Sequence, residues 1–187
     1  MRVLGLDPGS RRTGWGVVER SGNSFRCAGH GCIAPAPKLD LPHRLHHIAR
    51  EAGEVIDRFA PDVVVVEEAF YHESVRSTLV LGHVRGALLV AALERGLELA
   101  EYAPRAIKLA VTGNGASSKE QVEFMVRRLL ALPAVLQADA ADALAGALCH
   151  LNRSRFAPAG VSAKPTRRAN AAKQARALEA LVARAVR

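Results

Sequence analysis

Two short apolar segments, each ending in an acidic residue, constrain the fold of this chain more than any other feature. The first runs from Arg2 to Asp7, and the second is the continuous β-branched run Val63–Val66, which Glu67 follows. Such a run is typical of a strand that is covered on both faces of a sheet. Neighbouring parallel strands end at one edge of a sheet, so the two acids are expected to meet there. Alternation along the second strand favours Glu67 over Glu68.

A second pair of acids lies near the end of the chain. Asp139 and Asp142 are three residues apart in a helical pattern, which places them on one helix face. If this face meets the two strand ends, the four carboxylates form an oxygen-rich site suited to hard divalent cations such as Mg²⁺. Two-metal sites of this kind cut phosphodiesters. Each acid also has a simpler reading, because Asp before Pro-Gly is usually a turn residue and helical acids usually face water.

The remaining pattern predicts an α/β fold with a five-stranded mixed sheet flanked by helices. Strands are expected at 2–7, 14–18, 25–33, 63–66 and 97–102, and helices at about 45–59, 77–95, 117–132 and 138–152, with a brief helix at 108–111. The first three strands could form an antiparallel meander. Ser117 and Glu120 have the form of a capping box at the start of the third long helix.

The charge is unevenly distributed along the chain. The net charge is +8, and residues 157–187 hold seven Lys or Arg and one acid. We therefore expect a folded domain at 1–156 and a basic Ala/Arg-rich tail at 157–187 that is disordered or partly helical. A basic chain favours nucleic acid first and an anionic membrane second. No secretory signal or membrane span is expected, and the three cysteines suggest reduced thiols in a cytoplasm.

Several motifs resemble those of the RuvC family of Holliday junction resolvases. The resemblance covers about Met1–Leu151, nearly the whole predicted domain. The matching motifs are Leu4–Ser10, Thr13-Gly14, Gly16–Val18, Val66–Phe70, Leu81-Gly82, Arg85-Gly86, Ala106–Lys108, Val111–Gly115, Lys119 and Gln137–Leu144.

This resemblance implies a ribonuclease H-like fold and a homodimer. It implies metal-dependent cutting of four-way DNA junctions by paired symmetric nicks, in homologous recombination and DNA repair. Mg²⁺ is the expected cofactor, with two ions at each active site and Mn²⁺ as a substitute. The implied partners are the junction and a branch-migration motor complex of the RuvA and RuvB type, in a bacterial cytoplasm and with no membrane.

The resemblance also assigns roles to residues. Asp7, Glu67, Asp139 and Asp142 become the catalytic and metal-binding acids, and Lys108 and Lys119 the basic residues beside the scissile phosphate. Phe70 becomes the aromatic near the junction centre, with Tyr71 beside it. Arg76, Arg85 and Arg105, together with Arg11 and Arg12, are further candidate DNA contacts, although ordinary surface charge would also explain them. Departures from the family pattern occur at Glu73, Ser74, Val80 and His83.

Other interpretations remain open. An actin-like ATPase shares the first motif but needs a second domain, and a related RNA nuclease lacks the later acids and lysines. A non-catalytic DNA-binding module is a third alternative. The helix at 77–95 could form a dimer seam or pack in the core. His43, His46 and His47 could bind a metal or form a solvated helix face.

Overall fold

The structure, a computed structural model, describes residues 1–68, 74–133 and 135–154, and its centre is one five-stranded sheet. β1 (Arg2–Asp7), β2 (Thr13–Ser21) and β3 (Ser24–Ile33) form an antiparallel meander. β4 (Val63–Glu67) is parallel to β1, and β5 (Glu98–Tyr102) is parallel to β4. The strand order is β3-β2-β1-β4-β5, which confirms the predicted mixed sheet.

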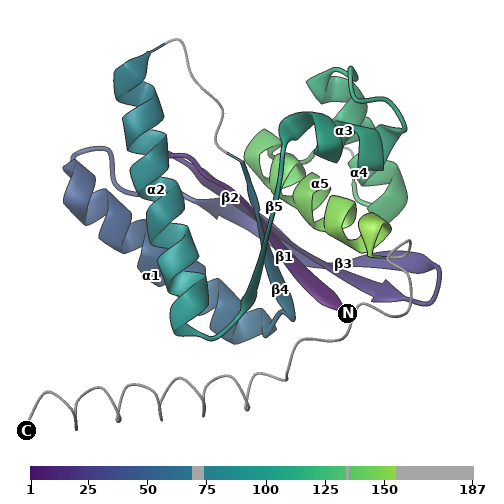
Figure 1. The fold of residues 1–187 in the computed structure, drawn as a ribbon, viewed down its shortest axis with the longest axis horizontal. Coiled ribbons are helices and arrows are strands. Elements are labelled where there is room, and N and C mark those ends of the chain that lie inside the picture. The colour runs from purple at the N-terminus through teal and green to yellow at the C-terminus, as the bar shows by residue number, and fades with distance from the viewer. Residues whose placement is uncertain (69–73, 134, 155–187) are drawn as a thin grey trace, which may run out of the picture. The chain divides into compact units, whose positions relative to one another are not determined.

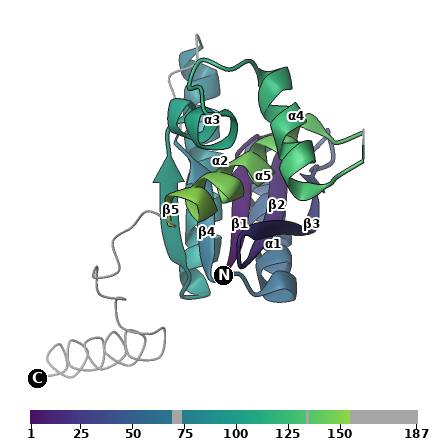
Figure 2. The ribbon, with the colours of Figure 1, turned by 90° about the vertical axis from the view of Figure 1, so that its right-hand side faces the viewer.

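Helices cover both faces of this sheet (Figures 1 and 2). α1 (Leu41–Phe59) and α2 (Val75–Glu94) lie on one face. α3 (Pro104–Thr112), α4 (Lys119–Leu130) and α5 (Ala138–Arg153) lie on the other. The alternation along the strands supplies both cores, because successive side chains point to opposite faces.

The two hydrophobic cores show which strand positions face which helices. Val3, Val63 and Val65 pack in the core under α3, α4 and α5. Leu4 and Leu6 pack in the other core, with α1 and α2. By the same alternation, Asp7 and Glu67 belong to the face covered by α5.

Three details of the helices differ from the prediction. α3 is a full helix that starts at Pro104, where proline is favoured in the first turn, rather than a brief helix at 108–111. α2 starts at Val75 with Ser74 as its N-cap. The capping box of α4 is formed by Ser118 and Gln121, one residue later than predicted.

The capping box shifts because the Ser117 side chain is engaged elsewhere. Its hydroxyl is buried and lies 2.7 Å from Oγ1 of Thr112, at the end of α3. Ser118 is therefore the residue that accepts from the Gln121 amide. The predicted tail at 157–187, and with it the predicted domain boundary, lies outside the described residues.

Candidate active site

Asp7 and Glu67 end two hydrogen-bonded parallel strands. The register pairs Leu6 of β1 with Val66 of β4, so the next residue of each strand is an acid at the same edge of the sheet. Both acids are only partly exposed, whereas Glu68 is exposed. The preference for Glu67 on strand alternation therefore agrees with the geometry.

α5 reaches these strands because two glycines leave room for its backbone. A Cβ on Gly5 would lie 1.8 Å from the carbonyl oxygen of Ala143, and one on Gly14 would lie 1.9 Å from that of Asp139. Neither distance is sterically possible, so any larger residue would push α5 away from the sheet. The close approach brings Asp142 to the edge where Asp7 lies.

Three of the four predicted acids and both predicted lysines line one pocket of about 350 Å³. We call it the acid pocket. It is lined by Asp7, Glu67, Pro104, Ile107, Lys108, Lys119, Val122, Asp142 and Ala145. These residues come from two strands and three helices that are far apart in the sequence, so folding has assembled them.

The acid pocket holds its carboxylates at a high electrostatic cost. Burial raises the pKa of Asp7 to about 7, and the charges of Asp142, Glu67 and Asp139 add to this rise. Burial also raises the pKa of Glu67 and of Asp142. Crowded, partly desolvated carboxylates are destabilised as anions and therefore favour a proton or a cation.

Lys119 partly neutralises this charge. Its Nζ lies 2.6 Å from Oδ2 of Asp142, and this contact raises the pKa of the lysine. Lys119 is the first residue of α4, next to the N-cap Ser118, so its position depends on the joint between α3 and α4. Lys108 approaches from α3 and lowers the pKa of Glu67 slightly against the effect of burial.

Asp139 lies beside the acid pocket and is not among the residues that line it. Its carboxylate is 3.1 Å from Nε of Arg12 and accepts a weak hydrogen bond from the Cys32 thiol at 3.8 Å. Asp139 precedes Asp142 by about one helical turn, which brings it over β2 and β3. Nothing local in the sequence links Arg12 to this acid, so their pairing was not predicted.

The joint between α3 and α4 is a second feature that was not predicted, although Thr112 and Asn114 belong to one of the matching motifs. The Thr112 hydroxyl lies 2.8 Å from the carbonyl oxygen of Lys108, 2.7 Å from the Ser117 hydroxyl and 3.1 Å from the Asn114 amide that donates to it. These contacts join the helix that carries Lys108 to the start of the helix that carries Lys119. The signal in the sequence was Thr112-Gly113-Asn114-Gly115, in which Gly113 adopts a positive φ of 81°.

The donor set of the acid pocket fits a hard divalent cation, since it consists of carboxylate oxygens. In the described ranges, no three Asp, Glu, His or Cys side chains are arranged to hold one ion as they stand. Asp142 is paired with Lys119 and Asp139 with Arg12, so each of these two carboxylates is held by a cation of the chain itself. A metal site would require these pairs to separate.

The other predicted DNA contacts are scattered. Phe70 and Tyr71, with the departure Glu73, lie outside the described residues. Arg76 and Arg105 are exposed in the first turns of α2 and α3. Arg85 is engaged in an ion pair with Glu101.

The histidines of α1 are separate from the acid pocket. His43 Nδ1 lies 2.5 Å from Oδ1 of Asp40, the N-cap of this helix, and His46 lines a groove between α1 and α2. Both side chains are exposed, and His47 is partly exposed.

Known proteins resemble this chain over most of its length. A family described as "Crossover junction endodeoxyribonuclease RuvC" matches residues 3–150. The protein of that name from Pelobacter propionicus is 47% identical over 167 residues, covering 89% of this chain and 95% of the relative. Its counterpart from Aliivibrio fischeri (strain MJ11) is 47% identical over 153 residues, covering 82% of this chain and 88% of the relative.

Solved structures match as well. Thermus thermophilus RuvC in complex with a Holliday junction substrate superposes with a TM-score of 0.79 at 37% identity, covering 83% of this chain and 96% of that one. The yeast mitochondrial Holliday junction resolvase Ydc2 superposes with a TM-score of 0.59 at 14% identity, covering 80% and 78%. At that identity, the second match speaks for a shared fold alone.

Proposed function

This chain belongs to the RuvC family of crossover junction endodeoxyribonucleases, and we propose that its acid pocket cuts four-way DNA junctions. The chain has the ribonuclease H-like fold of that family. The observation that carries the proposal is the meeting of Asp7, Glu67 and Asp142 with Lys108 and Lys119 in one pocket. Phosphodiester hydrolysis needs acidic residues that bind a cation and, close to them, basic residues that bind the phosphate. The activity serves homologous recombination and DNA repair.

Nucleases of this family depend on a metal. The finer proposal is that Mg²⁺ is the ion, that two bind at each site, and that Mn²⁺ can replace them. Asp7, Glu67 and Asp142 would hold the ions, with Asp139 beside them. Bound there, the metal supplies an activated water and charge stabilisation for the leaving 3′ oxygen. The raised pKa of Asp7 supports a cation in this place, because a cation would relieve the charge repulsion that a proton otherwise relieves.

The chain's own residues then have distinct tasks. The Asp139 carboxylate accepts a hydrogen bond from the attacking water and orients it. Lys119 leaves Asp142 and pairs with the scissile phosphate at the start of α4, where backbone amides also favour an anion. Lys108 adds positive charge to the same phosphate from α3. The lysine that stabilises the acids before the substrate binds thus becomes a substrate contact.

The test is to incubate the protein with a four-way junction and with a linear duplex of the same sequence, in Mg²⁺ or in chelator. We expect paired symmetric nicks in the junction only, and only with the metal. Asp7→Asn and Glu67→Gln should each reduce the cutting rate by at least roughly 100-fold, with junction binding retained.

Glu68→Gln is the matched control for Glu67→Gln. It makes the same chemical change one residue further along, on an exposed side chain, and should leave the cutting rate close to that of the wild type. Binding of junctions without cutting, with either metal and across several junction sequences, would instead identify a structural junction binder. Cutting of RNA or of the linear duplex would indicate a different ribonuclease H-like nuclease.

Paired nicks require two active sites, and we propose that two copies of the chain meet through α2. Val75, Leu79, Val90 and Leu93 are between 55% and 62% exposed. Together with Gly82 and Gly86 they recur every three or four residues, the spacing of one helix face. A Cβ on either glycine would meet nothing within 4 Å among the described residues, which leaves this face open to a second backbone. Below, this set of residues is called the α2 stripe.

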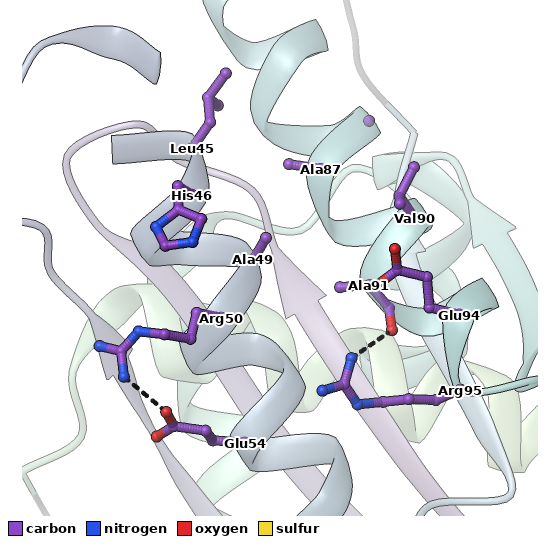
Figure 3. Close-up of a pocket in the computed structure, with 11 residues that line it drawn as sticks. Leu45, His46, Ala49, Arg50, Glu54, Ala87, Val90, Ala91, Glu94 and Arg95 are labelled. Carbon is purple, nitrogen blue, oxygen red and sulfur yellow. Dashed lines mark hydrogen bonds and ion pairs between the residues drawn. The ribbon is translucent and has the colours of Figure 1, made fainter. Parts of the chain in front are cut away.

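The groove beside the α2 stripe continues the same surface. It has a volume of about 530 Å³ and is lined by Leu45 and Ala49 of α1 and by Ala87, Val90 and Ala91 of α2; Figure 3 shows Ala87 and Ala91 on the side of α2 towards α1. α2 is also long and apolar enough to cross a membrane by length and composition, although no membrane span was predicted. That property is weak support for a membrane span, because an exposed apolar helix face in a dimer gives the same result. A second copy of the chain is the proposed occupant.

The remaining partners follow from the family. We propose that the protein works in a bacterial cytoplasm with a branch-migration motor of the RuvA and RuvB type. Bacterial relatives of this name act on DNA, which supports that location. Phe70 and Tyr71, just beyond β4, are proposed to contact unpaired bases at the junction centre.

A further inference from the structure

The loop that follows Asp7 also lines a second pocket. This pocket has a volume of about 320 Å³ and is lined by Ser10, Arg11, Pro35, Pro37 and Arg44. The first two residues belong to the loop between β1 and β2. The other three belong to the segment that runs from the end of β3 into the first turn of α1. None of the five lines the acid pocket.

The charge of this second pocket is positive. Arg11 is exposed, and neither Arg11 nor Arg44 forms an ion pair with a carboxylate in the part of the chain that the structure describes. Arg44 donates through Nε to the carbonyl oxygen of Leu39 at 2.8 Å, which restrains the side chain. The nearby acid, Asp40, accepts hydrogen bonds from the amide and the ring of His43 and does not line the pocket.

This composition suits a phosphate. Two guanidinium groups offer several N–H donors in a planar arrangement that matches phosphate oxygens, and the Ser10 hydroxyl is a further donor. Pro35 and Pro37 have fixed φ angles, which makes the rim of the pocket stiff. No carboxylate of the described residues lines the pocket, so these walls offer no ligand to a cation and do not repel an anion.

The position of the pocket connects it to DNA at the acid pocket. Asp7 pairs with Gly14 across β1 and β2, and Gly14 pairs with Cys32 across β2 and β3. The end of β1, the start of β2 and the end of β3 therefore lie along one edge of the sheet. A duplex arm that presented a phosphate at Asp7 and extended along this edge would bring a further phosphate towards Arg11 and Arg44.

We propose that Ser10, Arg11 and Arg44 together bind one backbone phosphate of the DNA arm beside the cutting site. The proposal depends on the proposed function for the identity of the ligand as DNA. It adds a binding site on the α1 side of the loop after Asp7, outside the acid pocket. Its consequence is that the duplex arm, as well as the junction centre, contributes to affinity.

The test measures DNA affinity against salt concentration in an Asp7→Asn background, so that binding is observed without cutting. Arg11→Ala, Arg44→Ala and the double variant are compared on a junction and on a linear duplex. Each single variant should weaken both complexes by roughly three- to tenfold and lower the slope of log affinity against log salt by about 0.9, the value for one lost phosphate contact. The double variant should be little weaker than the single ones, because both arginines serve one phosphate.

The matched control is Arg26→Ala with Arg58→Ala. These exposed arginines lie at the far end of β2 and β3 and in the last turn of α1, and removing both changes the net charge by the same amount. Equal losses in this control would assign the effect to overall charge and overturn the proposal. An unchanged affinity and slope in the double variant, or fully additive losses, would also overturn it. Arg11→Ala carries the test if Arg44→Ala disturbs the loop at Leu39.

Two further experiments distinguish a failure of this proposal from a failure of the proposed function. Inorganic phosphate, substituted for chloride at constant ionic strength, should not displace the duplex specifically from the wild type. Efficient displacement would indicate a site for free phosphate and overturn the proposal. Cutting by the otherwise unaltered protein tests the proposed function independently. Absence of cutting would refute that function while the duplex measurements still decide whether the two arginines bind a phosphate.

Discussion

At the scale of single residues, the acid pocket is a balance between carboxylates and the chain's own cations. Lys119 holds Asp142 and Arg12 holds Asp139, while Asp7 has no such pairing within the described residues and carries the pKa of about 7. The site therefore stores unfavourable charge at Asp7 when no metal is bound. A metal that replaces the proton on Asp7 releases this cost, so metal binding and protonation compete.

This competition predicts how stability depends on pH without metal. The pKa of Asp7 rises from its ordinary value of 3.8 to about 7 on folding, so between these values the folded protein binds a proton that the unfolded chain does not. The contribution of Asp7 to the free energy of unfolding is therefore lost as pH rises from about 4 to about 7. The raised pKa values of Glu67 and Asp142 act in the same direction.

Asp7→Asn removes this titration. In chelator, we expect the variant to be more stable than the wild type above pH 7, by up to about 3 kcal/mol, with the difference shrinking towards pH 4. Urea denaturation at a series of pH values measures it. Asp57→Asn should show the opposite sign, because its ion pair with Arg95 lowers the pKa of Asp57 in the fold. A pH-independent difference for Asp7→Asn would contradict the explanation.

At the scale of elements, the relative position of α3 and α4 decides where the two lysines point. The Thr112 hydroxyl joins these helices through Ser117, and Ser118 then caps α4 immediately before Lys119. Hydroxyl pairs of this kind contribute about 1 kcal/mol to stability, but their larger effect here is geometric. A displacement of about 1 Å at a reacting group can reduce a rate by roughly 100-fold.

Thr112→Val should therefore reduce the rate of cutting at saturating junction by roughly tenfold, with the junction dissociation constant within about twofold of wild type. Thr112→Ser keeps the hydroxyl and should restore most of the rate. Single-turnover cutting and equilibrium binding separate the two effects. Ser24→Ala, which removes an exposed hydroxyl from the first residue of β3, is the control. Weaker binding with an unchanged rate would assign Thr112 to DNA contact instead.

The helices and strands also show how much of the structure the sequence predicts. Apolar runs and helical spacing predicted the five strands and the main helices, because burial on one face or two leaves a direct trace in the pattern. For the same reason, strand alternation favoured Glu67 over Glu68 as the acid of the site. The spacing of Asp139 and Asp142 predicted one shared face, but one turn of helix is enough to place only Asp142 in the acid pocket.

Contacts between residues far apart in the sequence explain the shifted capping box and the unpredicted partner of Asp139. Both Ser117 with Glu120 and Ser118 with Gln121 fit a capping box, and the choice between them depends on the contact from Ser117 to Thr112 in another helix. The pairing of Arg12 with Asp139 joins residues more than a hundred positions apart. Such contacts depend on the assembled fold and leave no local periodicity, so propensity and spacing alone do not predict them.

At the scale of the whole molecule, the α2 stripe predicts the oligomeric state. Leu79→Glu with Val90→Glu places two charges on the proposed seam, where they would be buried and unpaired in a dimer. We expect a monomer by analytical ultracentrifugation with an unchanged circular dichroism spectrum, because both side chains are exposed in the single chain. Paired nicks should be lost. Leu109→Glu, on an exposed residue of α3, should leave the oligomeric state unchanged.

The distribution of charge over the whole chain leads to the last prediction. Residues 157–187 hold a net charge of +6 out of +8, so most of the basic excess lies beyond the proposed nuclease domain. Affinity that comes from such charge is insensitive to DNA sequence and structure and falls steeply with salt. The tail should therefore strengthen binding to linear duplex and to junction alike.

Deleting residues 157–187 tests this. The slope of log affinity against log salt should fall by about 0.9 for each phosphate that the tail neutralises, so by several units if most of its basic residues are engaged. The cutting rate at saturating junction should stay near that of the full chain, because the acid pocket lies entirely within the first 145 residues. An unchanged slope would mean that the tail does not bind DNA. In that case the affinity would rest on the basic groups of the domain itself, among them Arg11 and Arg44.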